Sequence, residues 1–353
     1  MPPRPPDFDF SRWPHIERAR LAARDMRRRI ESALEDNFAR LGSSDVSFVV
    51  FGSLAREEWT EHSDVDWMML VDGQADPQHD RIEREFRELL TTLGCVPPGQ
   101  TGMFGALDFS HALIHEIGGE EDTNSNITKR VSLLLEAKPI GGAEALERVV
   151  HGIIARYVDD VLVTTHLRFN EPRVPRFLLN DIVRFWRTMA VDYANKKRAR
   201  ATADWALRNF KLRMSRKLIF AAGLLTCFSC STELADDWKA AGRDPGDLEA
   251  VMNRHLFDYA RRTPLDIVAR AAERHGGEAL LGELLSAYDR FLELIGDGDS
   301  RSALRSLRLE RATDENPVWA RVNQICGEFE QGLVRLFYDS DAYRGLTRKY
   351  GVF

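Results

Sequence analysis

Residues 51–71 read FGSLAREEWTEHSDVDWMMLV and contain the features that decide the fold. The runs 46–51 and 65–71 are apolar and rich in β-branched and aromatic residues, which predicts two buried strands. Gly52-Ser53 ends the first run, and the polar residues 54–61 are compatible with a short helix. The predicted order is therefore strand, tight turn, short helix and strand.

The turn and the second strand carry residues suited to phosphate and metal chemistry. Glycine permits a sharp turn and lets backbone N–H groups approach a phosphate, toward which a helix starting at Ser53 would direct its positive end. Asp64 and Asp66 are two residues apart, so both carboxylates lie on one face of a strand. Two converging carboxylates suit Mg²⁺, and two such ions about 4 Å apart can activate a hydroxyl and neutralise a leaving pyrophosphate.

Each half of this pattern also has a purely structural interpretation. Gly-Ser is common, and Asp-x-Asp at the start of a strand can be turn chemistry. The combination favours the chemical interpretation, because Asp66 interrupts an apolar strand and is costly to bury without a cation.

The arrangement resembles the DNA polymerase beta-like nucleotidyltransferase superfamily, whose signature is Gly-Ser followed by Asp-x-Asp. It looks closest to the nucleotidyltransferase domain of bacterial protein-PII uridylyltransferase and its relatives. Toward their Gly-Ser-x-x-Arg-x-Glu and Ser-Asp-x-Asp segments this chain supplies Gly52, Ser53, Arg56, Glu57, Ser63, Asp64 and Asp66, with Glu58 at the last position of the first segment. Their downstream Asp-x-Thr and Leu-Leu-Glu-Ala-Arg segments are similar to Asp122-Thr123, to 134–138 and to Gly141, with Lys138 in place of the usual Arg. The similarity covers residues 45–145, weakens toward 225 and does not reach the C-terminal third.

The resemblance implies an α+β nucleotidyltransferase domain, with a small mixed sheet flanked by helices, followed by an all-α helical domain. We place the first domain, with an N-terminal helix, at residues 1–160 and the second at 161–353. It implies a third metal-binding and catalytic carboxylate beside Asp64 and Asp66, for which we favour Asp108 over Glu116. Residues 111–117 are expected to form a third strand.

The activity implied is Mg²⁺-dependent transfer of a nucleoside monophosphate from an NTP to a hydroxyl, with release of pyrophosphate. The acceptor would be a protein, as in PII uridylylation, or a small molecule. Two alternatives remain open at this point. One is a nucleotidyltransferase that makes a nucleotide second messenger or tails RNA, and the other is a catalytically weak nucleotide-binding regulator.

Charge is unevenly distributed along the chain. The net charge is −6, yet residues 175–225 contain 12 Lys and Arg against 3 Asp and Glu. Such a basic stretch attracts anions. In similar enzymes a helical domain offers cations to the triphosphate, which here suggests Lys211, Arg213 and Lys217, with Gly52 and Ser53, as nucleotide-binding residues.

Composition limits the class of protein. The 353 residues with 44% hydrophobic and 29% charged residues are typical of globular proteins. Four cysteines make no disulfide framework, and no apolar run reaches the ~20 residues of a membrane helix. We expect a cytoplasmic protein without a membrane partner, and the pI of 5.9 does not favour RNA. We also expect deletion of residues 231–353 to leave nucleotide binding and to alter acceptor choice.

Overall fold

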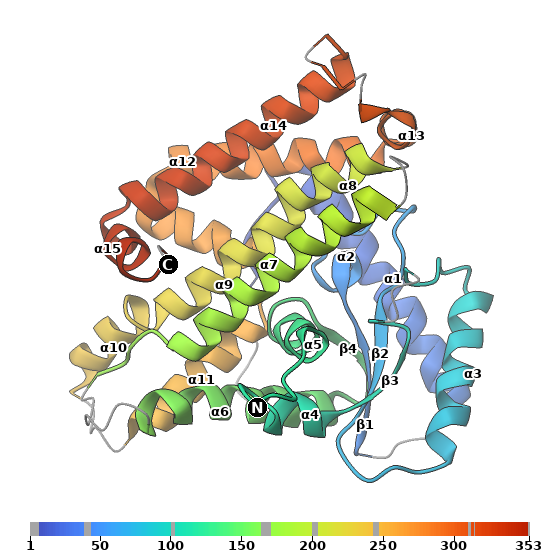
Figure 1. Cartoon of the computed structure of the whole chain (residues 1–353), viewed down its shortest axis with the longest axis vertical. Helices are drawn as coiled ribbons and strands as arrows, with labels where there is room; N and C mark the ends of the chain where they lie inside the picture. Colours follow the sequence, from blue (N-terminus) through green and yellow to red (C-terminus); the bar gives the residue numbers. More distant parts are fainter. Residues whose placement is uncertain are drawn as a thin grey trace. The chain divides into compact units, whose positions relative to one another are not determined.

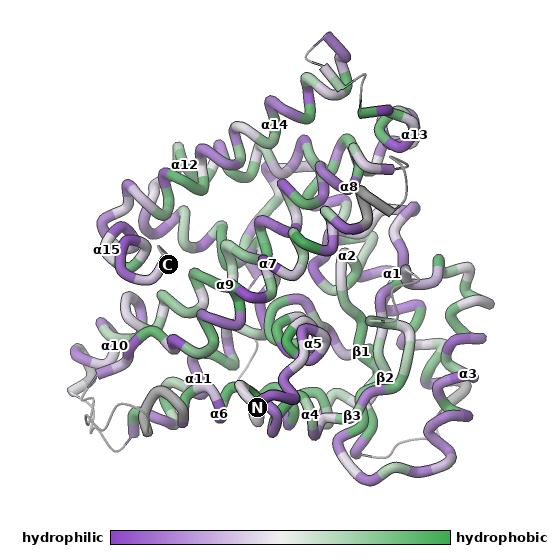
Figure 2. The backbone as a smooth tube through the Cα atoms, viewed as in Figure 1, coloured by the Kyte–Doolittle hydropathy of each residue, from purple (hydrophilic) through white to green (hydrophobic). Residues whose placement is uncertain are grey.

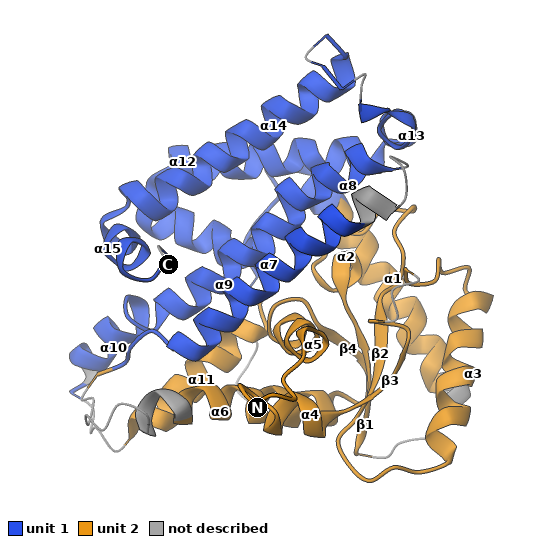
Figure 3. Ribbon diagram, viewed as in Figure 1, with its two compact units in different colours: residues 1–18, 172–242, 264–353 blue, residues 19–171, 243–263 orange. Residues whose placement is uncertain are grey.

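The chain forms two compact units, each assembled from separated segments (Figures 1 and 3). The computed structural model describes residues 7–38, 44–99, 103–163, 171–199, 204–242, 247–309, 312–313 and 315–351. The sheet unit comprises residues 19–171 and 243–263, and the helical unit comprises residues 1–18, 172–242 and 264–353. The sequence predicts one change of character near residue 160, whereas the chain crosses between the units several times.

The sheet unit is built on a small mixed sheet with the order β3-β2-β1-β4. The strands are β1 (Val46–Val50), β2 (Trp67–Val71), β3 (Ala106–Phe109) and β4 (Lys138–Gly141). β1 pairs antiparallel with β2 and with β4, while β2 and β3 are parallel. Figure 2 shows the apolar character of β1 and β2, whose residues are all buried. This confirms the predicted fold class, a small mixed sheet flanked by helices.

One face of this sheet packs on two long helices. α1 (Pro14–Phe38) and α3 (Gln78–Thr92) contribute Ile30, Leu34 and Phe86 to a core that includes Val50 and Trp67. Alternation along a strand sends every second side chain to this face, so the intervening residues point the other way. The remaining helices of the sheet unit before residue 171 are α2 (Gly52–Ala55), α4 (Ser110–His115), α5 (Asn124–Leu135) and α6 (Ala143–Val163).

A helix from much later in the sequence completes the sheet unit. α11 (Leu248–Ala260) packs against α6, where the rings of Phe257 and His151 stack with centroids 3.7 Å apart. Beyond its end, the Arg261 carbonyl accepts a hydrogen bond of 2.7 Å from Lys138 Nζ on β4. Deletion of residues 231–353 would thus remove α11 from the sheet unit, while the expectation that nucleotide binding survives this deletion stays a prediction.

The helical unit contains long helices and the start of the chain. Its elements are α7 (Arg176–Ala199), α8 (Trp205–Lys211), η1 (Leu212–Arg216), α9 (Lys217–Ser229), α10 (Glu233–Ala241), α12 (Pro264–Gly296), α13 (Gly298–Ser306), α14 (Pro317–Val334), η4 (Arg335–Asp339) and α15 (Asp341–Tyr350). The first amides of α1, those of His15 and Ile16, donate to Asp289 Oδ1 on α12 at 2.8 and 2.9 Å. A distant carboxylate therefore caps α1, whereas the sequence suggests a local cap near Ser11.

The stretch Trp205–Ala240 is long and apolar enough to cross a membrane, with a best-window mean hydropathy of 1.6. Of that window, 72% is buried inside the protein. α9 in this stretch is buried on most of its surface, including Ile219, Ala222 and Leu225. Burial within the helical unit accounts for its apolar composition.

The prediction of a strand at 111–117 is wrong. β3 lies just before it, at Ala106–Phe109, and α4 then covers Ser110–His115. The run HALIHEI is too short for its periodicity to distinguish a helix from a strand. Helices α6, α10 and α15 were also not expected.

Candidate functional site

The turn after β1 brings a glycine directly against a carboxylate. Gly52 has φ +64°, and a Cβ placed on it would lie 2.8 Å from Asp66 Oδ2. The amide of the preceding residue, Phe51, donates a 2.8 Å hydrogen bond to the Asp66 carbonyl. The left-handed backbone and the close approach both require glycine at this position. The Gly-Ser turn and the Asp-x-Asp segment therefore form one structural feature.

Asp64 and Asp66 share the face of the sheet opposite the α1–α3 core. They alternate with Val65 and Trp67, each 1% exposed and part of that core. Asp64 is held in extended conformation by a parallel bridge to Val96. Both aspartates are partly exposed. The predicted pair of same-face carboxylates, one of them touching the glycine turn, is thus present.

This donor set suits Mg²⁺ bound together with substrate phosphates. The described residues contain no group of three or more His, Cys, Asp or Glu arranged to hold a metal ion. Mg²⁺ often takes only one or two carboxylates and completes its shell with water and phosphate oxygens. Asp64 and Asp66, beside a turn on which no side chain fits, match that requirement.

The structure does not bring Asp108 to this pair. Asp108 on β3 is paired with Leu70, four residues beyond Asp66 along β2. At roughly 3.3 Å per residue, this is about 13 Å along the strand direction. Asp108 Oδ2 instead forms an ion pair of 2.6 Å with Lys129. The alternative candidate, Glu116, lies at the end of α4 and accepts a hydrogen bond of 3.3 Å from Asn126.

The two motif segments meet through a buried ion-pair network. Arg56 is 5% exposed and pairs with Glu58 at 2.9 Å and with Glu136. Glu136 also accepts a 3.1 Å hydrogen bond from the Ser132 hydroxyl on α5. The Gly-Ser-x-x-Arg segment is thereby joined to the Leu-Leu-Glu-Ala segment.

Asp122, in the Asp-Thr segment, has a structural role. Its carboxylate accepts two hydrogen bonds, of 3.1 and 2.9 Å, from fully buried Arg130, and one from the Gly118 amide. Arg130 also donates to the Tyr157 hydroxyl on α6 at 2.7 Å. This network anchors α5 to α6.

Sequence reasoning missed a cluster around Glu57. The Glu57 carboxylate is fully buried and contacts Arg20, Arg24 and Arg27 of α1. Burial alone would raise the pKa of Glu57, but hydrogen bonds from Arg24 and the charges of Arg20 and Arg27 outweigh it and lower the pKa to about 2. The spacing of the three arginines places them on one face of a helix, and this pattern could have predicted a binding surface for a carboxylate.

The predicted basic residues lie in the helical unit. Arg213 donates a 2.8 Å hydrogen bond to Asn323, and Lys217 pairs with Glu330 at 3.3 Å, so both contact α14. Lys211 is half-buried at the end of α8. Their role in binding a triphosphate stays a prediction.

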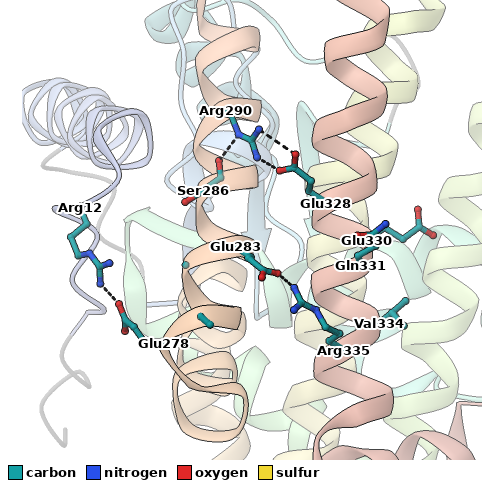
Figure 4. A pocket seen from close by; sticks show the side chains of 12 residues that line it. Arg12, Glu278, Glu283, Ser286, Arg290, Glu328, Glu330, Gln331, Val334 and Arg335 are labelled. Atoms are coloured by element: carbon teal, nitrogen blue, oxygen red, sulfur yellow. Dashed lines mark hydrogen bonds and ion pairs between the residues drawn. The ribbon is translucent and has the colours of Figure 1, made fainter. Parts of the chain in front are cut away.

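Two cavities lined by described residues lie away from the aspartates. A cavity of about 990 Å³ in the helical unit is bordered by the ion pairs Arg12–Glu278, Arg290–Glu328 and Arg335–Glu283 (Figure 4). A second, of about 290 Å³, is lined by Val65, Trp67 and Phe104 in the sheet unit. Val65 and Trp67 point away from the face that carries the aspartates, so neither cavity contains the predicted site.

A family model matches part of the chain. Residues 28–94 match the family model described as nucleotidyltransferase domain. The match spans the C-terminal part of α1 from residue 28, the Gly-Ser turn, Asp64-x-Asp66 and α3. No curated protein matches the chain. Residues 28–94 are therefore similar to a nucleotidyltransferase domain, which supports nucleotidyl transfer in general, while closeness to the PII-modifying enzymes stays a prediction.

Proposed function

We propose that this protein transfers a nucleoside monophosphate from an NTP to a hydroxyl acceptor. One observation carries the proposal: Gly52 lies so close to Asp66 that any side chain there would touch the carboxylate. In a segment similar to a nucleotidyltransferase domain, this contact brings the backbone of the Gly52–Ser53 turn next to two carboxylates on the same face of the sheet. A triphosphate and its cation need this combination.

Each residue then has a defined task. The Gly52 and Ser53 backbone would hold the terminal phosphates, and Asp64 and Asp66 would hold Mg²⁺. The ion, when bound, would supply charge neutralisation for the phosphates and activation of the acceptor. The acceptor hydroxyl loses its proton to solvent, its oxygen attacks the α-phosphorus and forms the new P–O bond, and the bond to pyrophosphate breaks so that pyrophosphate leaves. We further propose that Lys211, Arg213 and Lys217 contribute to triphosphate binding.

For the acceptor, we propose a protein side chain or a small molecule in the cytoplasm. The resemblance of residues 52–66 to PII-modifying enzymes supports a protein hydroxyl. The acidic pI of 5.9 argues against a long RNA, because a dedicated nucleic-acid binder is usually basic.

The test follows the label from each α-³²P NTP in the presence of a cell lysate, with and without Mg²⁺. The wild type is compared with Asp64→Asn/Asp66→Asn and with Asp72→Asn. Asp72 directly follows β2 and binds Ser110 and Arg148, so it is a matched Asp-to-Asn control. We expect Mg²⁺-dependent transfer in the wild type and the control, and none in the double variant.

The nature of the labelled product distinguishes the alternatives. Label on a protein band or a small molecule supports the proposal. A labelled oligonucleotide or a lengthened RNA would show that the acceptor is a nucleotide or an RNA, and would contradict the proposed acceptor. Nucleotide binding without transfer, in all lysates, would indicate a regulator, and absence of binding by folded protein would refute the site.

A further inference from the structure

Glu57, the second residue after α2, has an unusual backbone. Its φ is +64°, a left-handed conformation that side-chain-bearing residues rarely adopt. Glycine or asparagine would occupy this position at lower cost. A glutamate at this position indicates that contacts of its carboxylate stabilise the unfavourable backbone conformation.

Those surroundings are three guanidinium groups from one helix. Arg24 donates to Oε1 and Oε2 at 3.2 and 3.0 Å, Arg27 donates to Oε1 at 2.8 Å, and Arg20 lies 3.0 Å from Oε2. The side chains of Arg20 and Arg27 are only 3% and 11% exposed. Burying charges in this way contributes little net stability, because desolvation offsets the attraction, but it fixes geometry.

The same cluster also holds the turn that precedes it. Arg27 Nη1 donates a 2.9 Å hydrogen bond to the Leu54 carbonyl. The amides of Arg56 and Glu58 donate to the carbonyls of Gly52 and Ser53, at 3.0 and 2.8 Å. All three carbonyls of residues 52–54 therefore have donors, and one of these donors comes from α1. The Gly52–Ser53 turn is fixed at its far end by contacts with Glu57 and Arg27.

We propose that Arg24 and Arg27, acting through Glu57, are positioning residues for nucleotidyl transfer. They hold Glu57 in its left-handed conformation and thereby set the distance of the Gly52–Ser53 backbone from Asp66. The proposal rests on the proposed function of that turn. It extends the site to α1, a helix to which the sequence motif assigns no role.

The experiment compares full-length wild type with Arg27→Gln, Arg27→Lys and Arg28→Gln. Arg28 is the matched control, since it lies next to Arg27 on α1 and its guanidinium group binds exposed Asp25 and the Arg24 carbonyl on the same helix. Two measurements are made: hydrogen exchange of the amides of residues 52–58 without ligand, and kcat and KM for Mg·NTP.

For Arg27→Gln we expect faster exchange in residues 52–58 and a loss of at least about tenfold in kcat/KM, mainly in kcat, because small misplacements of a reacting group are costly. Arg27→Lys keeps the positive charge but removes the planar guanidinium group with its several donors. This variant should therefore recover part of the kcat/KM that Arg27→Gln loses. Arg28→Gln should match the wild type in both measurements.

Unchanged exchange and kinetics in folded Arg27→Gln would overturn the proposal. Faster exchange with unchanged kcat/KM would also overturn it, since the cluster would then be only structural. If Arg27→Gln does not fold, Arg24→Gln decides by the same criteria, because the Arg24 side chain is 37% exposed and its loss leaves two arginines on Glu57. A wild type that transfers no nucleotide refutes the proposed function, whereas the exchange measurement still reports on the cluster.

Discussion

Gly52 and Asp66 are so close that a methyl group on the glycine would lie 2.8 Å from the aspartate Oδ2. Thirteen residues, 53–65, lie between them in the sequence. Because of this contact, a substitution of Gly52 tests the site without replacing Asp64 or Asp66.

Gly52→Ala should abolish most activity while the protein stays folded. The left-handed backbone costs alanine about 1–2 kcal/mol, and the methyl group displaces the Asp66 carboxylate. Gly94→Ala is the control, because Gly94 has φ +75° with no neighbour within 4 Å of a Cβ. Urea unfolding should show similar destabilisation for both variants, and only Gly52→Ala should lose about 100-fold or more in transfer rate. Equal activity of the two variants would contradict this account.

Asp108→Asn should leave Mg²⁺-dependent transfer within about threefold of wild type, a change of less than 1 kcal/mol. The β2–β3 register places Asp108 well beyond Asp66, and its carboxylate pairs with Lys129. Initial rates across a Mg²⁺ titration measure the effect. A large increase in the Mg²⁺ concentration required would instead identify Asp108 as the third ligand that the resemblance implies.

Acid should remove the stabilisation that Glu57 provides. Its pKa is lowered from 4.5 to about 2, so its contribution is complete above pH 4.5 and is lost as the pH falls toward 2. The shift corresponds to about 3 kcal/mol at most. The difference in unfolding free energy between wild type and Glu57→Gln should therefore shrink between pH 5 and pH 3. A difference that stays constant over this range would show that Glu57 is not held as a carboxylate.

A chain ending at residue 230 should not fold cooperatively. It lacks α11, whose buried Met252, Leu256 and Phe257 belong to the sheet unit. The exposed partner surface on α6 would then favour aggregation. Thermal unfolding followed by circular dichroism checks this, and a sharp transition with retained nucleotide binding would show that α11 is dispensable.

Local patterns predicted the central part of the molecule. β1 and β2 are continuous apolar runs bounded by Gly52-Ser53 and by Asp72-Gly73, so their positions followed from the sequence. The alternation of Asp64 and Asp66 with Val65 also fixed their common face. These features depend on residues that are close in the chain.

Features that depend on distant residues were not predicted. The sequence predicted an all-α domain after residue 160 but could not show that α11 packs against α6. The partners of Glu57 lie 30 to 37 residues earlier, on a helix recognised only by its apolar stripe. β3 is four residues long with no buried position, so it lacked the apolar signal of a strand.

The discontinuous sheet unit has a consequence for biosynthesis. Domains generally fold as units, with N-terminal ones first, during translation. Here, the last helix of the sheet unit leaves the ribosome only after residue 263, when much of the helical unit has already been made. The helical unit cannot be complete until α12 has been synthesised, because Asp289 of α12 caps α1. The sheet unit therefore needs residues up to 263, about three-quarters of the 353 residues, and the cap of α1 needs Asp289, about four-fifths of the way along. Such a delay is typical of folds with many long-range contacts, which extend the time a nascent chain needs protection.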